Sequence, residues 1–196
     1  MKNIKNFILV GILLGFSLSV KSQSITDTDV SSFRYDINGL YPKFVVMEID
    51  SMNQSELFEK TINWIKENYK NPDEVIKTTI SNEKIRFVGF QDGIIELKTM
   101  GMASYYGVTY TIEIEFKDGK YRFIPGNCEY RVPVSQYGGG QTVVIDWNNG
   151  LQWYNKGEVR KMYKNIPSNI ENLLNNLNDN LFNYLSLKTG LKKEDW

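Results

Sequence analysis

GVTYTIEIEFKDGKYRFIP, residues 107–125, is the stretch that decides the fold, because its first half alternates apolar and polar side chains without a break. Successive side chains on a β-strand point to opposite faces, so this period of two places five apolar groups on one face. Asp118 and Gly119 then supply a turn, since glycine tolerates the positive φ of a tight hairpin turn. The return strand starts at Tyr121. We therefore predict a β-hairpin with one buried face.

More strands and a helix are predicted around this hairpin. The other strand candidates are 43–49, 74–81, 84–90, 94–100, 127–132 and 141–147. After the first of them, Asn53 and Glu56 have the spacing of a capping box, which predicts a helix over 55–69. A run of strands with helices before and after it, in the order β-α-β-β-β-β-β-α, indicates the α+β class. We expect an antiparallel meander with helix packed across one face.

The last helix is predicted by apolar residues that recur at i, i+3, i+4 and i+7 from Ile170 to Leu185. Ser168 and Glu171 form a capping box after Pro167, and Gly190 is a natural stop. A shorter helical pattern precedes it, from Val159 to Ile166. Asparagine occupies positions 169, 172, 175, 176, 178, 180 and 183. Because asparagine lowers helix propensity by up to about 0.7 kcal/mol per residue, we expect packing to hold this helix.

Residues 1–22 have the pattern of a secretory signal peptide, with Lys2 and Lys5 before an apolar run and small residues before the cut. We expect cleavage before Gln23 and export to the periplasm, the outer envelope or the cell exterior. A retained membrane anchor is the alternative. The apolar run is shorter than the roughly 20 residues needed to cross a bilayer, so no stable membrane span is expected after cleavage.

The mature chain is expected to be one domain. We predict a polar lead-in segment at 23–42 and an α+β domain over 43–190, which includes a Gly-rich and aromatic loop at 133–157. Residues 191–196 are expected to form a C-terminal tail. The apolar content of 41% suits a domain that buries its own core.

Charge and composition argue against several classes of function. The full chain has 23 basic and 23 acidic residues, and removing Lys2, Lys5 and Lys21 with the signal leaves 20 against 23, a net charge of −3. Nucleic-acid binding needs a basic surface, so no nucleic-acid partner is expected. The chain has no histidine and a single cysteine, Cys128, which rules out the Ser-His-Asp and Cys-His catalytic arrangements and the usual zinc sites. We expect no catalytic residue, no metal site and no cofactor, and we expect Cys128 to be a buried apolar thiol.

Several phrases carry a resemblance to a known family: 53–57 before the first helix, Trp64 within it, and the strand and turn at 108–116 and 117–123. Over about residues 44–132 the chain resembles the exported bacterial family described as domain of unknown function 4468 with TBP-like fold. The resemblance implies a curved antiparallel sheet with two helices packed against it, like one repeat of the TATA-binding protein. It implies no catalytic residue. DNA binding is not implied either, because fold does not fix function.

The aromatic residues Tyr137, Trp147, Trp153 and Tyr154 are the predicted binding site. They lie in or beside the Gly-rich loop, and aromatic faces on a loop can stack on sugar rings or contact a protein partner. The alternative is that they form a small satellite core over the edge or open face of the sheet.

These observations predict a non-catalytic binding module of the envelope or the exterior, with an unknown protein or glycan as its partner. The competing hypothesis is a hydrolase that uses carboxylates alone, such as a glycosidase. It needs two acidic groups that converge in a cleft. Glu113 and Glu115 have a suitable spacing on one strand face, although solvation is the ordinary fate of such residues.

Overall fold

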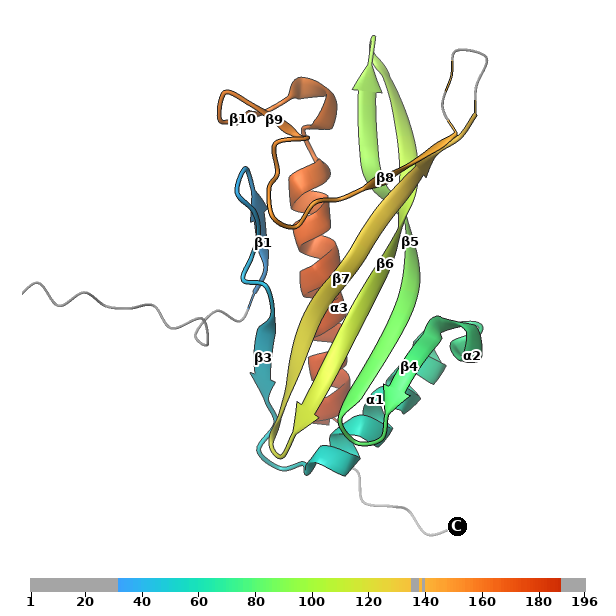
Figure 1. Ribbon diagram of the computed structural model, residues 1–196, viewed down its shortest axis with the longest axis vertical. Helices are drawn as coiled ribbons and strands as arrows, with labels where there is room; N and C mark the ends of the chain where they lie inside the picture. The colour runs from blue at the N-terminus through green and yellow to red at the C-terminus, as the bar shows by residue number, and fades with distance from the viewer. Residues whose placement is uncertain (1–31, 135–137, 139, 188–196) are drawn as a thin grey trace, which may run out of the picture.

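The computed structural model describes residues 32–134, 138 and 140–187, and it is built on one large antiparallel sheet (Figure 1). The strand order is β3-β7-β6-β5-β4, with β8 also paired to β7. The strands are β3 (Val45–Glu48), β4 (Ile76–Ile80), β5 (Lys84–Thr99), β6 (Met102–Lys117), β7 (Lys120–Val132) and β8 (Gln141–Val144). The antiparallel α+β prediction is therefore confirmed.

The predicted hairpin forms the centre of this sheet. Phe116 pairs with Tyr121 across the turn, and Gly119 has a φ of 73°. The apolar side chains of β6 from Val108 to Phe116 are at most 3% exposed, whereas Glu115 on the alternate face is half-buried. The period of two in the sequence therefore separates the core face of the sheet from its open face.

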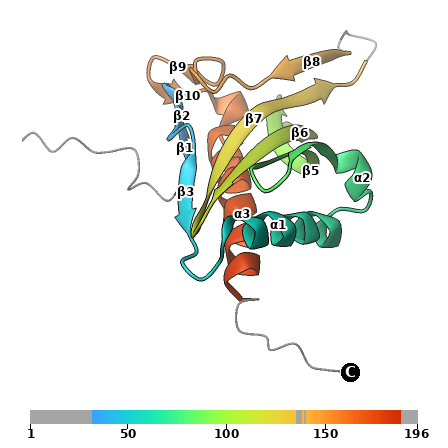
Figure 2. The ribbon, with the colours of Figure 1, turned by 60° about the horizontal axis from the view of Figure 1, so that its bottom comes forward.

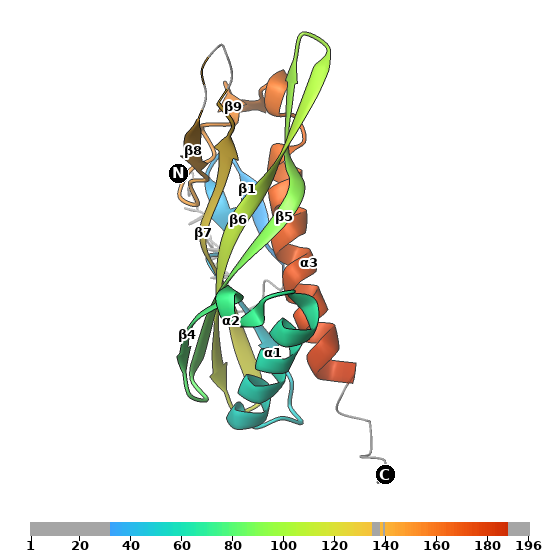
Figure 3. The same ribbon diagram turned by 90° about the vertical axis from the view of Figure 1, so that its right-hand side faces the viewer.

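Two long helices cover the core face. Helix α1 (Gln54–Asn68) and helix α3 (Ile166–Leu187) lie on the same side of the sheet (Figure 3) and cross near its lower end (Figure 2). The capping box of α1 is present, because Glu56 N donates to Asn53 Oδ1 at 2.9 Å and Asn53 N donates to Glu56 Oε2 at 3.0 Å. Within the described part of the chain, none of the helices combines the length and apolarity needed to cross a membrane.

The start of α3 differs from the prediction. The helix begins at Ile166, and Ser168 is its third residue and not its cap. Its hydroxyl donates to Asn165 O at 3.0 Å, and Asn169 N donates to the same carbonyl at 2.9 Å. The short helix predicted from Val159 is instead a 3-10 turn, η1 (Lys161–Tyr163), after the strands β9 (Tyr154–Asn155) and β10 (Glu158–Val159). Gly190 lies outside the described residues.

Strand β5 is also longer than predicted, because residues 91–93 do not turn the chain. From Gln91 to Ile95 the strand advances four residues while its partner β6 advances two, from Val108 to Tyr106. The two extra residues form a bulge. Gly93 lies in this bulge and has a φ of 72°. Beyond it the β5–β6 hairpin projects past the rest of the sheet (Figure 1).

The described residues before β3, from residue 32 onward, are part of the fold and not a loose lead-in. Strands β1 (Arg34–Asp36) and β2 (Gly39–Tyr41) form a small hairpin. Phe33, Tyr35 and Leu40 are at most 3% exposed. The packed domain therefore starts before Lys43, the boundary expected from the polar composition. A helix α2 (Pro72–Val75) connects α1 to β4.

Cys128 lies on β7 and is buried, as predicted. Burial raises the pKa of its thiol to about 12, and the nearby charge of Glu129 acts in the same direction. A thiol in this state behaves as a small apolar group.

Candidate functional site

Three of the four predicted aromatic residues, Trp147, Trp153 and Tyr154, lie around the buried Tyr35. Trp153 is 2% exposed, and its ring packs 6.3 Å from Tyr130 and 5.3 Å from Tyr163. The half-buried Trp147 meets Tyr35 edge to face at 5.8 Å. Tyr154 is half-buried on β9, and Tyr137 lies outside the described residues. We call Tyr35, Trp147, Trp153 and Tyr154 the aromatic cluster.

Trp147 fills a gap in the hydrogen bonding along the edge of strand β7. Strand β7 pairs with β3 at one end and with β8 at the other, which leaves Gly126 between the two partners. The Trp147 indole donates its N–H to the Gly126 carbonyl there. The Trp147 carbonyl in turn accepts from Leu40 N at 2.9 Å and from Lys43 Nζ at 2.6 Å. Trp147 therefore ties the β1–β2 hairpin to the sheet.

Tyr35 is the polar centre of the aromatic cluster. Its hydroxyl donates to the Asp146 carbonyl at 2.8 Å, and burial raises the pKa of the hydroxyl to about 12. The side-chain N–H groups of Gln152 and Trp153 oppose that shift from nearby. Neither group has a hydrogen-bond partner of good geometry among the described residues. These contacts describe a satellite core, and binding by the exposed parts of Trp147 and Tyr154 stays a prediction.

The acidic pair proposed for hydrolysis lies in an ion-pair network on the open face. Lys84 Nζ is 2.8 Å from Glu113 and 3.3 Å from Glu115, Arg86 is 2.6 Å from Glu113, and Arg122 is 3.3 Å from Glu115. Partial burial raises the pKa of Glu113, but hydrogen bonds from Lys84 and Arg86 outweigh it and lower the pKa overall. The general acid of a glycosidase needs a raised pKa, whereas the pKa of Glu113 is lowered.

A hollow of about 950 Å³ adjoins this network, and its lining carries charges of both signs. Arg122 lies over the Phe44 ring there, 4.6 Å from the ring centre, and also pairs with Glu115. Lys84 is paired with the same carboxylate. Lys84, Glu115 and Arg122 therefore already have ion-pair partners within the protein, which leaves less of their charge for a ligand.

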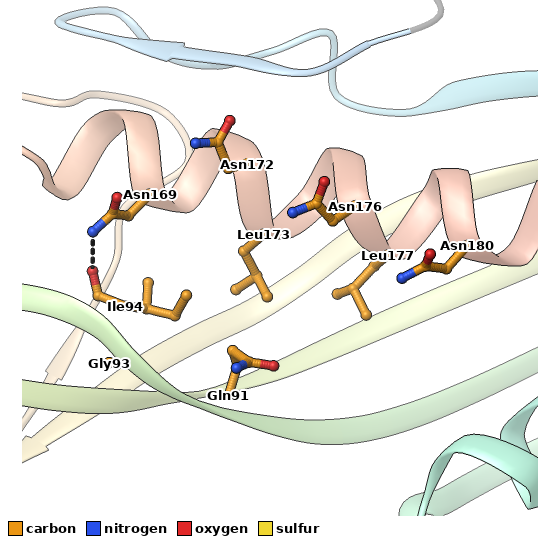
Figure 4. Close-up of a pocket in the computed structure, with 9 residues that line it drawn as sticks. All are labelled: Gln91, Gly93, Ile94, Asn169, Asn172, Leu173, Asn176, Leu177 and Asn180. Carbon is orange, nitrogen blue, oxygen red and sulfur yellow. Dashed lines mark hydrogen bonds between the residues drawn. The ribbon is translucent and has the colours of Figure 1, made fainter.

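A second cleft, of about 400 Å³, lies between α3 and the bulge of β5 (Figure 4). Leu173 and Leu177 point from the helix toward β5, where Gln91 faces them. The helix also contributes four asparagines to the lining, Asn169, Asn172, Asn176 and Asn180. The residues that line this cleft include no charged side chain. Its surface is therefore amide-rich around an apolar floor.

The asparagines of α3 fall into two groups by their hydrogen bonds. Asn175 Oδ1 accepts from Phe33 N at 2.7 Å and its Nδ2 donates to Phe33 O at 3.0 Å. The buried Asn178 accepts from the Tyr121 hydroxyl at 3.0 Å, and Asn169 Nδ2 donates to Ile94 O at 2.9 Å. In contrast, the exposed residues Asn172, Asn176 and Asn180 have no side-chain hydrogen bond within the described part of the chain. We call these three the amide row.

In the sequence the amide row is a set of asparagines four residues apart, and this pattern by itself predicts only a loss of helix propensity. The spacing gives no sign of which asparagines have partners inside the protein. Asn175 and Phe33 are 142 positions apart, and Asn178 and Tyr121 are 57 apart. Among the described residues, no three acidic or cysteine side chains come together as a metal site would require.

Residues 44–131 match the model of the family described as "Domain of unknown function (DUF4468) with TBP-like fold". The resemblance seen in the sequence is confirmed. This DUF4468 segment spans β3 to β7 and supplies the β5 side of the cleft, whereas the amide row lies beyond it. A search of curated proteins found no match.

Two solved structures share the fold. A DUF4468 family protein from Bacteroides ovatus aligns over 78% of this chain and 88% of its own, with 14% identity and a TM-score of 0.51. A TBP-like protein from Parabacteroides distasonis aligns over 72% of this chain and 90% of its own, with 17% identity and a TM-score of 0.53. At these identities the likeness extends to the DUF4468 fold and not to a ligand.

Proposed function

We propose that this protein is an exported, non-catalytic binding module that holds an uncharged protein segment or glycan in the cleft between α3 and β5. The amide row carries the proposal. Asn172, Asn176 and Asn180 place three side-chain amides on one cleft without partners inside the described part of the chain. Each amide offers two donors and an acceptor, so the row complements a ligand rich in hydroxyl or amide groups.

The helix loses intrinsic stability by having these residues. Asparagine at an exposed helix position is about 0.7 kcal/mol less favourable than alanine. Asn175 and Asn178 compensate with hydrogen bonds inside the protein. The amide row makes no such bonds within the described residues, so a ligand is the compensation that we propose.

The expected site of action is the periplasm, the outer envelope or the exterior. The support is the N-terminal sequence, in which Lys2 and Lys5 precede an apolar run that ends before Gln23. Detection of mature protein starting at Gln23 in a periplasmic or culture fraction is the direct measurement.

The binding test uses the mature chain, residues 23–196, in a thermal-shift screen against uncharged oligosaccharides and uncharged peptides. A ligand that binds only the native state stabilises it by about 2.7 kcal/mol at a hundredfold excess over Kd. The triple variant Asn172→Ala, Asn176→Ala, Asn180→Ala should lose the shift. The matched control is Asn183→Ala, an exposed asparagine of the same helix that does not line the cleft. Equal shifts in the triple variant and in the control would exclude the cleft as the site.

A further inference from the structure

We propose that the cleft recognises the main chain of an extended polypeptide segment of another protein, one whose side chains are uncharged. This inference rests on the proposed function and specifies its ligand. The occupant would lie along α3, with its peptide groups bonded to the amide row and its apolar side chains against the half-buried Leu177 and Ile94.

The same helix already binds extended main chain through asparagine. Asn175 makes a two-bond pair with Phe33, at 2.7 Å to its N–H and 3.0 Å to its C=O, immediately before β1. Asn169 donates to the Ile94 carbonyl in the bulge of β5 at 2.9 Å. The Asn175 amide makes both of the main-chain bonds that a neighbouring strand would make with Phe33, and the Asn169 amide makes one such bond with Ile94. The amide row presents the same group to the cleft.

The spacing of the amide row fits an extended chain. Residues four apart on a helix advance by about 6 Å, and alternate residues of a β-strand advance by about 6.6 Å. Asn172, Asn176 and Asn180 can therefore bond to the peptide groups of every second residue of a segment that runs parallel to α3. A ligand with a different repeat would lose this register after one contact.

The lining of the cleft also favours a peptide over a glycan. The residues that line it include no aromatic side chain, and stacking on an aromatic ring is the usual support for a sugar. They include no charged side chain either, so a charged segment would lose solvation without gaining a partner. The half-buried Leu177 and Ile94 offer apolar surface to every second side chain of an extended segment.

The test compares the blocked hexapeptide acetyl-(Ser-Val)₃-amide with the same peptide N-methylated at alternate residues, using calorimetry with the mature chain. N-methylation removes main-chain donors and leaves the side chains unchanged. We expect the parent peptide and acetyl-(Thr-Leu)₃-amide to bind alike, and the peptide methylated in the bonded register not to bind. Each single substitution, such as Asn176→Ala, should weaken binding about fivefold, as expected for one net hydrogen bond. Asn183→Ala should leave the affinity unchanged.

The outcomes separate this inference from the proposed function. If uncharged oligosaccharides bind through the amide row and both peptides fail, the main-chain inference is overturned while the binding-module proposal survives. If the methylated peptides bind as well as their parents, recognition does not use the main chain and the inference also fails. If neither peptide nor oligosaccharide binds the mature chain, both proposals fail.

Discussion

The aromatic cluster around Tyr35 and the amide row on α3 differ in how their polar groups are used. In the aromatic cluster, the Trp147 indole and the Tyr35 hydroxyl bond to carbonyl groups of the same chain. In the amide row, the side chains of Asn172, Asn176 and Asn180 make no such bonds within the described residues. The two regions also differ in exposure, because the Trp153 indole N–H has no partner of good geometry but is buried, whereas the side chains of the amide row reach solvent and are accessible to a ligand.

The largest change in stability is expected at Trp153 of the aromatic cluster. Replacing it with alanine should destabilise the fold by about 3–5 kcal/mol, because it leaves a cavity beside Tyr130 and Tyr163. Urea unfolding followed by circular dichroism measures the change. Met102→Ala is the control, since Met102 is 72% exposed and should change stability by less than about 0.5 kcal/mol. Similar losses in the two variants would show that the aromatic cluster is not a packed core.

A smaller loss is expected at Asn178, the buried asparagine of the same helix. Alanine there removes the nearer acceptor of the Tyr121 hydroxyl, at 3.0 Å, and leaves only the Asn178 backbone carbonyl at 3.4 Å, so we expect a loss of about 1 kcal/mol. Asn183→Ala, at an exposed position of α3, should be neutral or slightly stabilising. If both variants unfold at the same urea concentration as the parent, the division of the asparagines into paired and unpaired groups is wrong.

The open face of the sheet should respond to pH. Because the pKa of Glu113 is lowered below its ordinary value of 4.5, its ion pairs stabilise the fold at neutral pH. That contribution is lost as pH falls through the folded-state pKa. Glu113→Gln should therefore cost about 1 kcal/mol or less at pH 7, and the difference should shrink in urea titrations repeated at lower pH. Glu59→Gln, on the exposed side of α1, is the control. If the stability difference between the parent and Glu113→Gln grew on acidification, the ionised Glu113 would destabilise the fold.

The smallest effect is expected in the amide row itself. The triple alanine variant should be as stable as the parent or more so, by up to about 0.7 kcal/mol per residue, because alanine is the better helix former. The same urea measurement applies. A clear loss of stability would mean that these amides have partners inside the protein, and the contrast with the aromatic cluster would disappear.

The parts of the fold that could be predicted from the sequence are those with local patterns. The β6–β7 hairpin follows from alternation and one turn glycine, and the start of α1 follows from Asn53 and Glu56, three residues apart. Helix α3 was found by its apolar spacing, but its start was misplaced. Ser168 has the sequence of a cap, whereas Asn165 supplies the carbonyl that receives the first bonds.

The missed parts depend on distant contacts. Strands β1 and β2 have three residues each, too few for a pattern. Their hairpin is held by α3, through Asn175, and by the Trp147 carbonyl. The cleft is missed for the same reason, because Gln91 of β5 and the helix residues Leu173 and Leu177 face each other only after the sheet and the helix have packed. A single sequence shows which residues are asparagine and not which of them are already bonded.

The buried thiol of Cys128 makes unfolding of this protein measurable by thiol labelling. The thiol is 1% exposed on β7 and its pKa is raised to about 12, so the reactive thiolate is both rare and shielded in the native state. Unfolding restores both reactivity and access. Since the chain has one cysteine, every labelled molecule reports the same event, and under conditions of fast reclosing the labelling rate follows the free energy of opening. The stability of the central sheet can thus be followed by mass spectrometry at neutral pH, without denaturant.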